Sequence, residues 1–249
     1  MAGAEHTVHM DDDDLLPAWQ TVIDVGRAGA ATDLTLFGGL MVAVHGRRAG
    51  VVMRRSTDDV DVLVDFRANR SSLTDAAFAL RGLGFELSAG EREPAYRFIH
   101  VDSRKVDIMV ADHLPSGMRP RLQQRDAFAA PAGQQAIDRR DTYVLTFNGG
   151  ASVTLGVPDE LGAIVAKGAA FTVDQRDRGR HLDDAAVLFA CVTDASALDY
   201  DGTSRNDRRR IRALTSQISG PAHTSWTNLD PQDRERGQMN VALISGAIG

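Results

Sequence analysis

The chain has few of the residues that could cross-link it or hold it in a membrane. Among its 249 residues there is one cysteine, Cys191, so an internal disulfide and a cysteine-based zinc site are both excluded. Because Cys191 lies in an apolar run, a buried and unreactive thiol is favoured. No apolar run approaches the roughly 18–20 residues that span a bilayer, and the polar, acidic first residues do not resemble a secretory signal. We therefore expect a cytoplasmic protein that does not bind membranes.

Lysine is also scarce. Of the 28 basic residues only Lys105 and Lys167 are lysines, which indicates a coding bias towards arginine and makes each lysine a candidate for a specific role. The net charge of −6 is uneven, since residues 1–33 hold seven acids against Arg27 alone. The arginines gather in clusters that permit binding of a polyanion, although a solvated surface is the alternative interpretation. The clusters are Arg47, Arg48, Arg54 and Arg55; Arg119, Arg121 and Arg125; Arg176, Arg178 and Arg180; and residues 205–212.

The apolar patterns predict an α/β half followed by a helical half. We expect a disordered acidic tail over residues 1–14, an α/β (α+β) lobe with a mixed sheet over 15–156, and a helical lobe over 157–249, with a cleft between the lobes. Strands are predicted over 34–37, 60–64, 85–88, 96–102, 105–110, 143–147 and 151–155, the last two forming a hairpin across Asn148-Gly149-Gly150. Helices are predicted over 15–25, 72–84, 158–171, 180–192, 204–218 and 231–244, and another begins at Leu40.

Two carboxylates stand out in the run Asp-Val-Asp-Val-Leu-Val-Asp at 59–65. Alternate side chains of a strand share a face, so Val60 and Val62 would point into the core and Asp59 and Asp61 would lie together on the other face. Neighbouring carboxylates repel unless a cation lies between them, and oxygen ligands of this kind suit Mg²⁺. The alternative interpretation of an isolated Asp-x-Asp is an edge strand with solvated acids.

A second strand has the same pattern. In residues 105–110, Val106, Ile108 and Val110 would face the core and Asp107 would emerge on the opposite face. If this strand neighbours residues 60–64, the sheet presents three carboxylates at one place. That number suits a pair of magnesium ions in a phosphoryl transfer.

A Gly38-Gly39 pair lies where the short strand 34–37 meets a helix. Glycine lets a phosphate approach the backbone closely, and the start of a helix offers N–H groups and a positive dipole. The Asp-x-Asp motif follows about 20 residues later. Between them, Arg55 and Thr57 could contact phosphate or could be uninvolved loop residues.

These blocks, in this order, resemble the polymerase-β-like nucleotidyltransferase superfamily, and most of all the AbiEii/AbiGii (MenT-like) toxins of toxin–antitoxin systems. The likeness covers about residues 34–192. Its first block reads GGLMVAVHGRR and then RSTDDVDVLV, its second is Val106-Asp107-Ile108, and later blocks are VPDELGAIVAK, ending at Lys167, and RHLDDAA, from Arg180. Two departures are that Gly39 stands where many relatives have serine, and His181 where an acidic residue is common.

The resemblance implies a nucleotidyltransferase-fold lobe followed by a helical lobe, with Mg²⁺ held by Asp59, Asp61 and Asp107. It implies a nucleoside triphosphate as co-substrate, the 3′ end of tRNA as acceptor, and a possible cognate antitoxin as partner. It also assigns catalytic roles to Lys167 and Asp184, and nucleotide contacts to Gly38, Gly39, Arg55, Thr57 and Lys167.

The residues themselves leave the role of Lys167 open. It shares a helical face with the apolar Ile164 and Phe171, so its stem could simply extend along that face to water. Alternatively, its ammonium could neutralise the triphosphate. Asp184 could pair with Lys167 or lie on the surface beside His181. The histidines, including His45, His100 and His113, have no spacing that predicts a zinc site.

The sequence therefore predicts an enzyme of the nucleotidyltransferase class (EC 2.7.7 type). An acceptor hydroxyl would attack the α-phosphate of a nucleoside triphosphate and release pyrophosphate. Two alternatives remain open at this point. One is the same chemistry on a small hydroxylated molecule such as an aminoglycoside, or on a protein. The other is a non-catalytic binding or antitoxin-like module.

Overall fold

The chain divides into two compact units in a computed structural model that describes residues 3–10, 16–28, 34–53, 57–90 and 94–249. The first unit comprises Met1–Leu40 and Thr57–Pro158, and the second comprises Met41–Ser56 and Asp159–Gly249. Helix α2 (Gly38–Ala49) carries the chain from the first unit into the second. Mixed α/β architecture is confirmed: the described residues form eight α-helices and a large sheet with both parallel and antiparallel strands.

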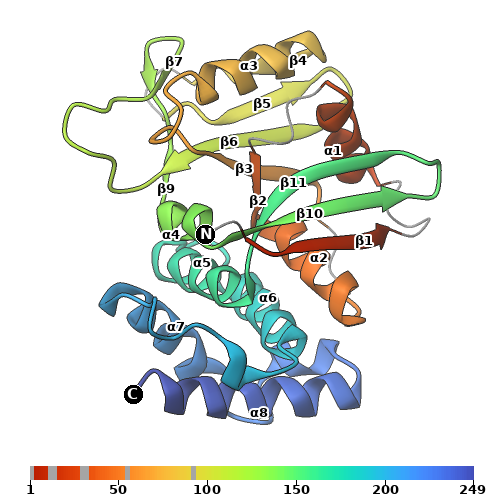
Figure 1. Ribbon diagram of the computed structural model, residues 1–249, viewed down its shortest axis with the longest axis vertical. Coiled ribbons are helices and arrows are strands. Elements are labelled where there is room, and N and C mark those ends of the chain that lie inside the picture. Colours follow the sequence, from red (N-terminus) through yellow and green to blue (C-terminus); the bar gives the residue numbers. More distant parts are fainter. Residues whose placement is uncertain (1–2, 11–15, 29–33, 54–56, 91–93) are drawn as a thin grey trace. The chain divides into compact units, whose positions relative to one another are not determined.

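The first unit is built on a nine-stranded sheet, counted over the described residues (Figure 1). Its strands are β1 (Glu5–Met10), β2 (Leu34–Phe37), β3 (Asp59–Val64), β4 (Phe85–Leu87), β5 (Arg97–His100), β6 (Lys105–Ala111), β9 (Ala129–Ala130), β10 (Arg140–Phe147) and β11 (Ser152–Pro158). The order across the sheet is β1-β10-β11-β2-β3-β6-β5-β4, and β9 pairs with one end of β6. The pair β3–β6 is parallel, whereas β2–β3 and β5–β6 are antiparallel.

Helices cover both faces of this sheet. On one face, α1 (Pro17–Arg27) and α3 (Ser72–Gly82) pack over the valines and isoleucine of β3 and β6, which are Val60, Val62, Val106 and Ile108. They leave an apolar cavity of about 20 Å³, room for about one water. On the other face, the short helix α4 (Gly133–Asp138) packs against Leu63 and Met109. The alternation of β3 and β6 therefore buries one face fully and leaves part of the other for polar side chains.

The prediction of a disordered tail over residues 1–14 is wrong for Glu5–Met10. These residues form β1, which pairs in parallel with β10 from Glu5↔Thr142 to Met10↔Phe147. Val8 and Met10 alternate with polar residues and are buried, so the segment has the period of a half-buried strand. In the sequence, the four aspartates that follow this short pattern make the whole segment resemble an acidic tail. Residues 11–15 lie outside the described part of the chain.

Residues 113–139, where the sequence gives no clear pattern, contain short elements only. The strands β7 (Arg121–Leu122) and β8 (Arg125–Asp126) form a small separate hairpin, and β9 and α4 follow. Such elements span two to six residues, too few for an apolar period to repeat clearly, which is why periodicity does not reveal them. The predicted hairpin at 143–155 is confirmed as β10 and β11.

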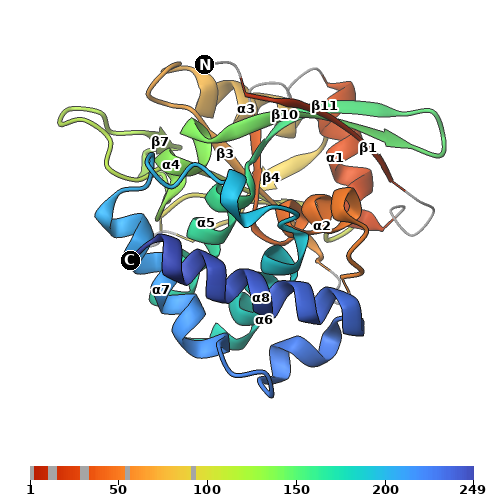
Figure 2. The ribbon, with the colours of Figure 1, turned by 60° about the horizontal axis from the view of Figure 1, so that its bottom comes forward.

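The second unit is helical, as Figure 2 shows. Its elements are α5 (Glu160–Val173), α6 (Arg178–Cys191), η2 (Ala195–Ala197), α7 (Arg205–Ile218), η3 (Thr224–Asn228) and α8 (Pro231–Ala247). The fully buried Trp226 donates its indole N–H to the carbonyl of Ile218, and buried Asn240 donates to the carbonyls of Phe189 and Val192. Cys191 is buried as expected, and burial raises the pKa of its thiol to about 12.

Among the described residues, no helix combines the length and the apolar composition that crossing a membrane requires.

Candidate functional site

Two rows of mostly charged residues cross one face of the first unit's sheet. The first row runs through the register partners Phe37, Asp61, Asp107 and Arg97, on β2, β3, β6 and β5. The second row runs through Asp59, Lys105 and Ile99, on β3, β6 and β5. Because β3 and β6 are parallel and in this register, Asp61 lies beside Asp107, and Asp59 shares their face two residues away. The two acidic strands are therefore neighbours, which is the condition under which the sequence places three carboxylates at one spot.

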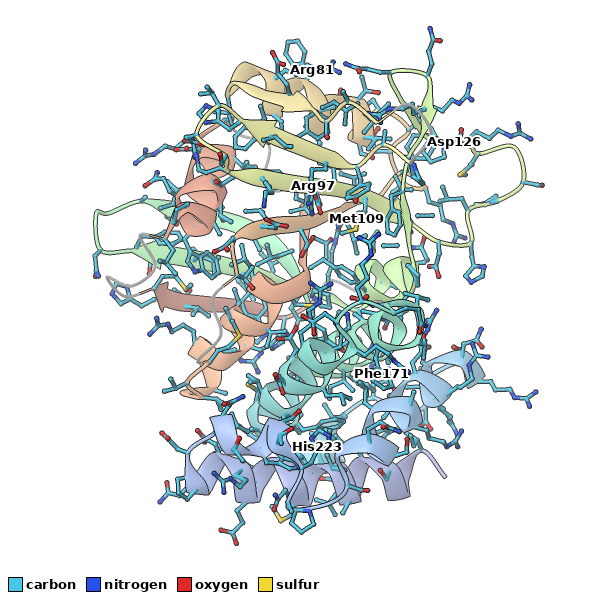
Figure 3. The ribbon with its side chains drawn as sticks, turned by 180° about the vertical axis from the view of Figure 1, so that it is seen from behind. Arg81, Arg97, Met109, Asp126, Phe171 and His223 are labelled. Atoms are coloured by element: carbon cyan, nitrogen blue, oxygen red, sulfur yellow. The ribbon has the colours of Figure 1, made fainter. Side chains whose placement is uncertain are left out.

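Arg97, which is labelled in Figure 3, hydrogen-bonds to two of the three carboxylates. Its Nε and Nη2 donate to Oδ1 and Oδ2 of Asp107 at 2.9 and 2.8 Å, and Nη2 also donates to Oδ2 of Asp59 at 3.0 Å. The hydrogen bond to Asp107 is the main cause that raises the pKa of Arg97 above its already high ordinary value. Arg97 is therefore a permanent cation held in a bidentate, charge-assisted pair.

Lys105 supplies a second cation to the same face. Its Nζ lies 3.4 Å from Oδ1 of Asp59. Arg97 and Lys105 together contact both oxygens of Asp59 and both oxygens of Asp107. The side chain of Asp107 is 8% exposed and that of Arg97 is 34% exposed, so the pair extends from the protein interior to solvent.

The carboxylates do not yet form a closed ligand set. Within the described residues, no group of three or more His, Cys, Asp or Glu side chains is arranged so that it could hold a metal ion. The donors nevertheless fit magnesium in kind, since three carboxylates on neighbouring strands offer only hard oxygen ligands. The guanidinium of Arg97 occupies the oxygens that such an ion would use.

Gly38 and Gly39 lie against two of the predicted site residues. Gly38 has φ +64°, in the left-handed region that favours glycine, and a Cβ atom there would overlap with the carboxylate of Asp61. A Cβ atom on Gly39 would overlap with the Oγ1 of Thr57. The Gly-Gly pair thus lets the first turn of α2 approach Asp61 and Thr57 closely. Arg55, also predicted to bind phosphate, lies outside the described residues.

An apolar cluster continues the same face beyond the carboxylates. Leu63 and Met109, two residues after Asp61 and Asp107, are buried, and the partly buried Phe37, Tyr96 and Phe128 pack against this cluster. The rings of Tyr96 and Phe128 lie 5.4 Å apart at a tilt of 51°. The face therefore has a charged part and an aromatic part next to each other.

In the second unit, Lys167 and Asp184 form a buried ion pair. Their Nζ and Oδ2 atoms are 2.7 Å apart, and the side chains are 7% and 3% exposed. Of the alternatives left open by the sequence, the pairing of Asp184 with Lys167 is correct, whereas a lysine that extends to water and a surface aspartate are wrong. Both side chains face the α5–α6 interface because the surrounding positions of both helices are apolar.

His181 lies one turn before Asp184 on α6 and is buried too. Its Nε2 atom is 3.1 Å from Oδ2 of Asp174, while its Nδ1 has no hydrogen-bond partner among the described residues. Burial, and next the charge of Lys167, lower the pKa of the imidazole. His181 is therefore neutral at pH 7.

Several arginines of the predicted clusters form ion pairs with acidic side chains. Arg48 pairs with Glu160 at 2.7 Å, Arg121 with Asp126 at 2.9 Å, and Arg180 with Asp174 at 2.9 Å. On α7, Arg205, Arg209 and Arg212 lie exposed at i, i+4 and i+7 and line a hollow of about 410 Å³, and Arg212 also donates to the carbonyls of Ile248 and Gly249. Helical spacing places them on one face.

Arg97 is the residue of this candidate site that the sequence does not predict. It lies in a predicted strand, two residues after the Ala95 bridge, and no motif marks it. Arg97 alternates with the buried Phe98, so the strand pattern places its side chain on the face opposite to the core. From the sequence alone, it would therefore be interpreted as a surface arginine. Comparisons of the chain with models of protein families, with curated proteins and with solved structures give no match.

Proposed function

We propose that the protein is a magnesium-dependent nucleotidyltransferase. The observation that supports this most is the register Asp61↔Asp107 on parallel strands, with Asp59 on the same face and Gly38 pressed against Asp61. Three carboxylates beside the start of a helix are what phosphoryl transfer from a triphosphate needs. In this proposal the first unit is the nucleotidyltransferase lobe and the second unit is the helical lobe.

Asp59, Asp61 and Asp107 would hold the magnesium. When bound, Mg²⁺ would supply positive charge for the triphosphate and would lower the pKa of the acceptor hydroxyl. The amides in the first turn of α2, which helix geometry leaves without intrahelical partners, are suited to receive phosphate oxygens. Thr57, whose Oγ1 lies against Gly39, is suited to donate a further hydrogen bond to them.

Asp107 is the carboxylate best suited to accept the proton of the acceptor. Of the three carboxylates only Asp107 is buried, with its side chain 8% exposed against 29% for that of Asp59. The acceptor oxygen forms a bond to the α-phosphorus as the bond from that phosphorus to the bridging oxygen breaks. Pyrophosphate leaves with the electron pair of that bond, and the hydroxyl proton moves to the carboxylate.

The acceptor that we propose is the 3′ end of tRNA, in a toxin that a cognate antitoxin protein would neutralise. The resemblance of residues 34–192 to the AbiEii/AbiGii toxins supports it, together with the exposed row Arg205, Arg209 and Arg212. Guanidinium groups in a row match successive phosphates. The resemblance also implies that Lys167 contacts the triphosphate. This contact stays a prediction, because the partner of Lys167 in the structure is Asp184.

The test is a labelling assay with an inactive variant. Purified protein is incubated with Mg²⁺, each labelled nucleoside triphosphate separately, and total RNA, and label should appear on tRNA, with CTP or UTP preferred. Asp61→Asn should reduce the label at least 100-fold without unfolding the protein, because a carboxamide is a poor magnesium ligand. Asp126→Asn, which removes an exposed carboxylate, is the matched control. Label on a small molecule or protein instead of RNA would redirect the acceptor, and no transfer with any triphosphate would reject the enzyme.

A further inference from the structure

We propose that Arg97 is a built-in counter-cation that competes with magnesium for Asp59 and Asp107, so that the metal enters together with the triphosphate. The inference rests on the proposed function, in which the same carboxylates bind the metal. It adds a positioning residue that governs the order of loading.

Arg97 already occupies carboxylate oxygens that magnesium would need. Arg97 donates to both oxygens of Asp107 and to Oδ2 of Asp59, at 2.8 to 3.0 Å. Magnesium needs close, nearly octahedral contact with its oxygen ligands. A guanidinium that hydrogen-bonds to both oxygens of Asp107 uses one lone pair of each and places a positive charge beside the position a metal would take, so the two cations compete for that carboxylate.

Two cations of the protein already offset most of the negative charge on this face of the sheet. Three carboxylates on neighbouring strands would repel each other, and repulsion of this kind is relieved by a cation between them. Arg97 and Lys105 provide two positive charges to Asp59 and Asp107. Two positive charges against three carboxylates leave the face with a net charge of only about −1, which stabilises the sheet of the metal-free protein and weakens its attraction for a free divalent ion.

The guanidinium of Arg97 can leave the carboxylates when the metal enters. Arg97 lies on β5, one strand from the sheet edge, and is 34% exposed, so its end can turn towards solvent. A triphosphate offers pairs of oxygens that accept two parallel hydrogen bonds from a planar guanidinium, as a carboxylate does. Magnesium bound to a triphosphate thus brings both the cation for the carboxylates and an anion for Arg97, whereas free magnesium brings only the first.

The experiment compares magnesium binding with and without nucleotide by calorimetry. The wild-type chain should bind free Mg²⁺ weakly. Arg97→Gln should bind it at least 10-fold more tightly, and its metal-free form should melt at a lower temperature that saturating Mg²⁺ restores. Arg97→Lys, which keeps a charge but loses the fork, should lie between the two. Arg104→Gln is the matched control, because Arg104 is also a paired arginine but contacts Asp24 and Asp102.

The outcomes separate this inference from the function on which it rests. Tighter binding of free Mg²⁺ by Arg97→Gln alone supports the competition. Equal affinity in wild type and Arg97→Gln, with metal bound in both, overturns the competition and leaves the metal site standing. Failure of every variant to bind Mg²⁺, with or without a triphosphate, overturns the magnesium centre and the inference together.

Discussion

At the scale of single residues, burial decides what a charged side chain can do. Lys167 and Asp184 are almost completely buried and pair at 2.7 Å. Removing one partner of such a pair leaves an uncompensated charge in the interior, which typically costs about 3–5 kcal/mol, whereas replacing both by apolar residues is often neutral. Any loss of activity in a Lys167 variant therefore needs a stability measurement beside it.

We expect Lys167→Met to lower the free energy of unfolding by about 3–5 kcal/mol. The double variant Lys167→Met/Asp184→Leu should recover most of this loss, as measured by urea denaturation. If the double variant is stable but inactive in the labelling assay, the pair serves catalysis. An unchanged stability in Lys167→Met would contradict the buried pair itself.

The residue scale is also where the sequence predicts least. Asp59, Asp61 and Asp107 are predictable because their strands alternate strictly and their acids break the apolar pattern. Arg97 is not, because its partners lie 10 and 38 positions away along the chain. No local period encodes such a contact; it depends on which strands become neighbours.

At the scale of elements, the strands and long helices follow from their own patterns. The predicted ranges 60–64, 105–110 and 204–218 become β3, β6 and α7 within one residue at each end. Where an element is short, as with β9 and α4, or where its apolar residues adjoin a charged run, as in β1, the pattern is too brief to be recognised. Strand order in turn depends on pairings between distant segments, which a single sequence does not provide.

The start of α2 gives a prediction at this scale. Gly39→Ala should destabilise the protein by about 1–3 kcal/mol, because its Cβ would overlap with Thr57, and overpacking of this kind costs that amount. Thermal denaturation of Gly39→Ala, Thr57→Ala and the double variant measures the coupling between the two positions. Thr57→Ala should relieve part of the overlap.

The control for this cycle is Gly82→Ala. Gly82 ends α3, and a Cβ atom there would meet nothing within 4 Å. Alanine at such a position should be neutral or stabilise by up to about 1 kcal/mol. Equal destabilisation by both glycine substitutions would mean that the contact with Thr57 is not the cause.

At the scale of the whole molecule, His181 should make stability depend on pH. Its pKa is lowered in the folded state by burial and by Lys167, so below pH about 6.5 the unfolded chain binds a proton that the folded chain does not. Stability from this residue is thus present above pH 6.5 and is lost as the pH falls. The carboxylate of Asp174, whose pKa is lowered, stays ionised throughout this window.

We therefore expect the melting temperature to fall between pH 7 and pH 5, and His181→Gln to flatten this dependence. His113→Gln, which changes a histidine with an 80% exposed side chain, should leave the slope as in wild type. Equal slopes for wild type and His181→Gln would show that the buried imidazole is not the group responsible.

The edge strand β1 has a consequence for synthesis on the ribosome. Its six residues emerge before the other strands of the sheet, but their pairing partner, β10, is translated about 135 residues later. Until then Val8 and Met10 have no sheet to cover them, and the first unit lacks its outer strands while most of α2, which belongs to the other unit from Met41 on, has already been made. Contacts this distant in sequence slow folding. The nascent chain should therefore remain exposed to chaperones and proteases until β10 and β11 have left the exit tunnel, which sets the completion of the first unit late in translation.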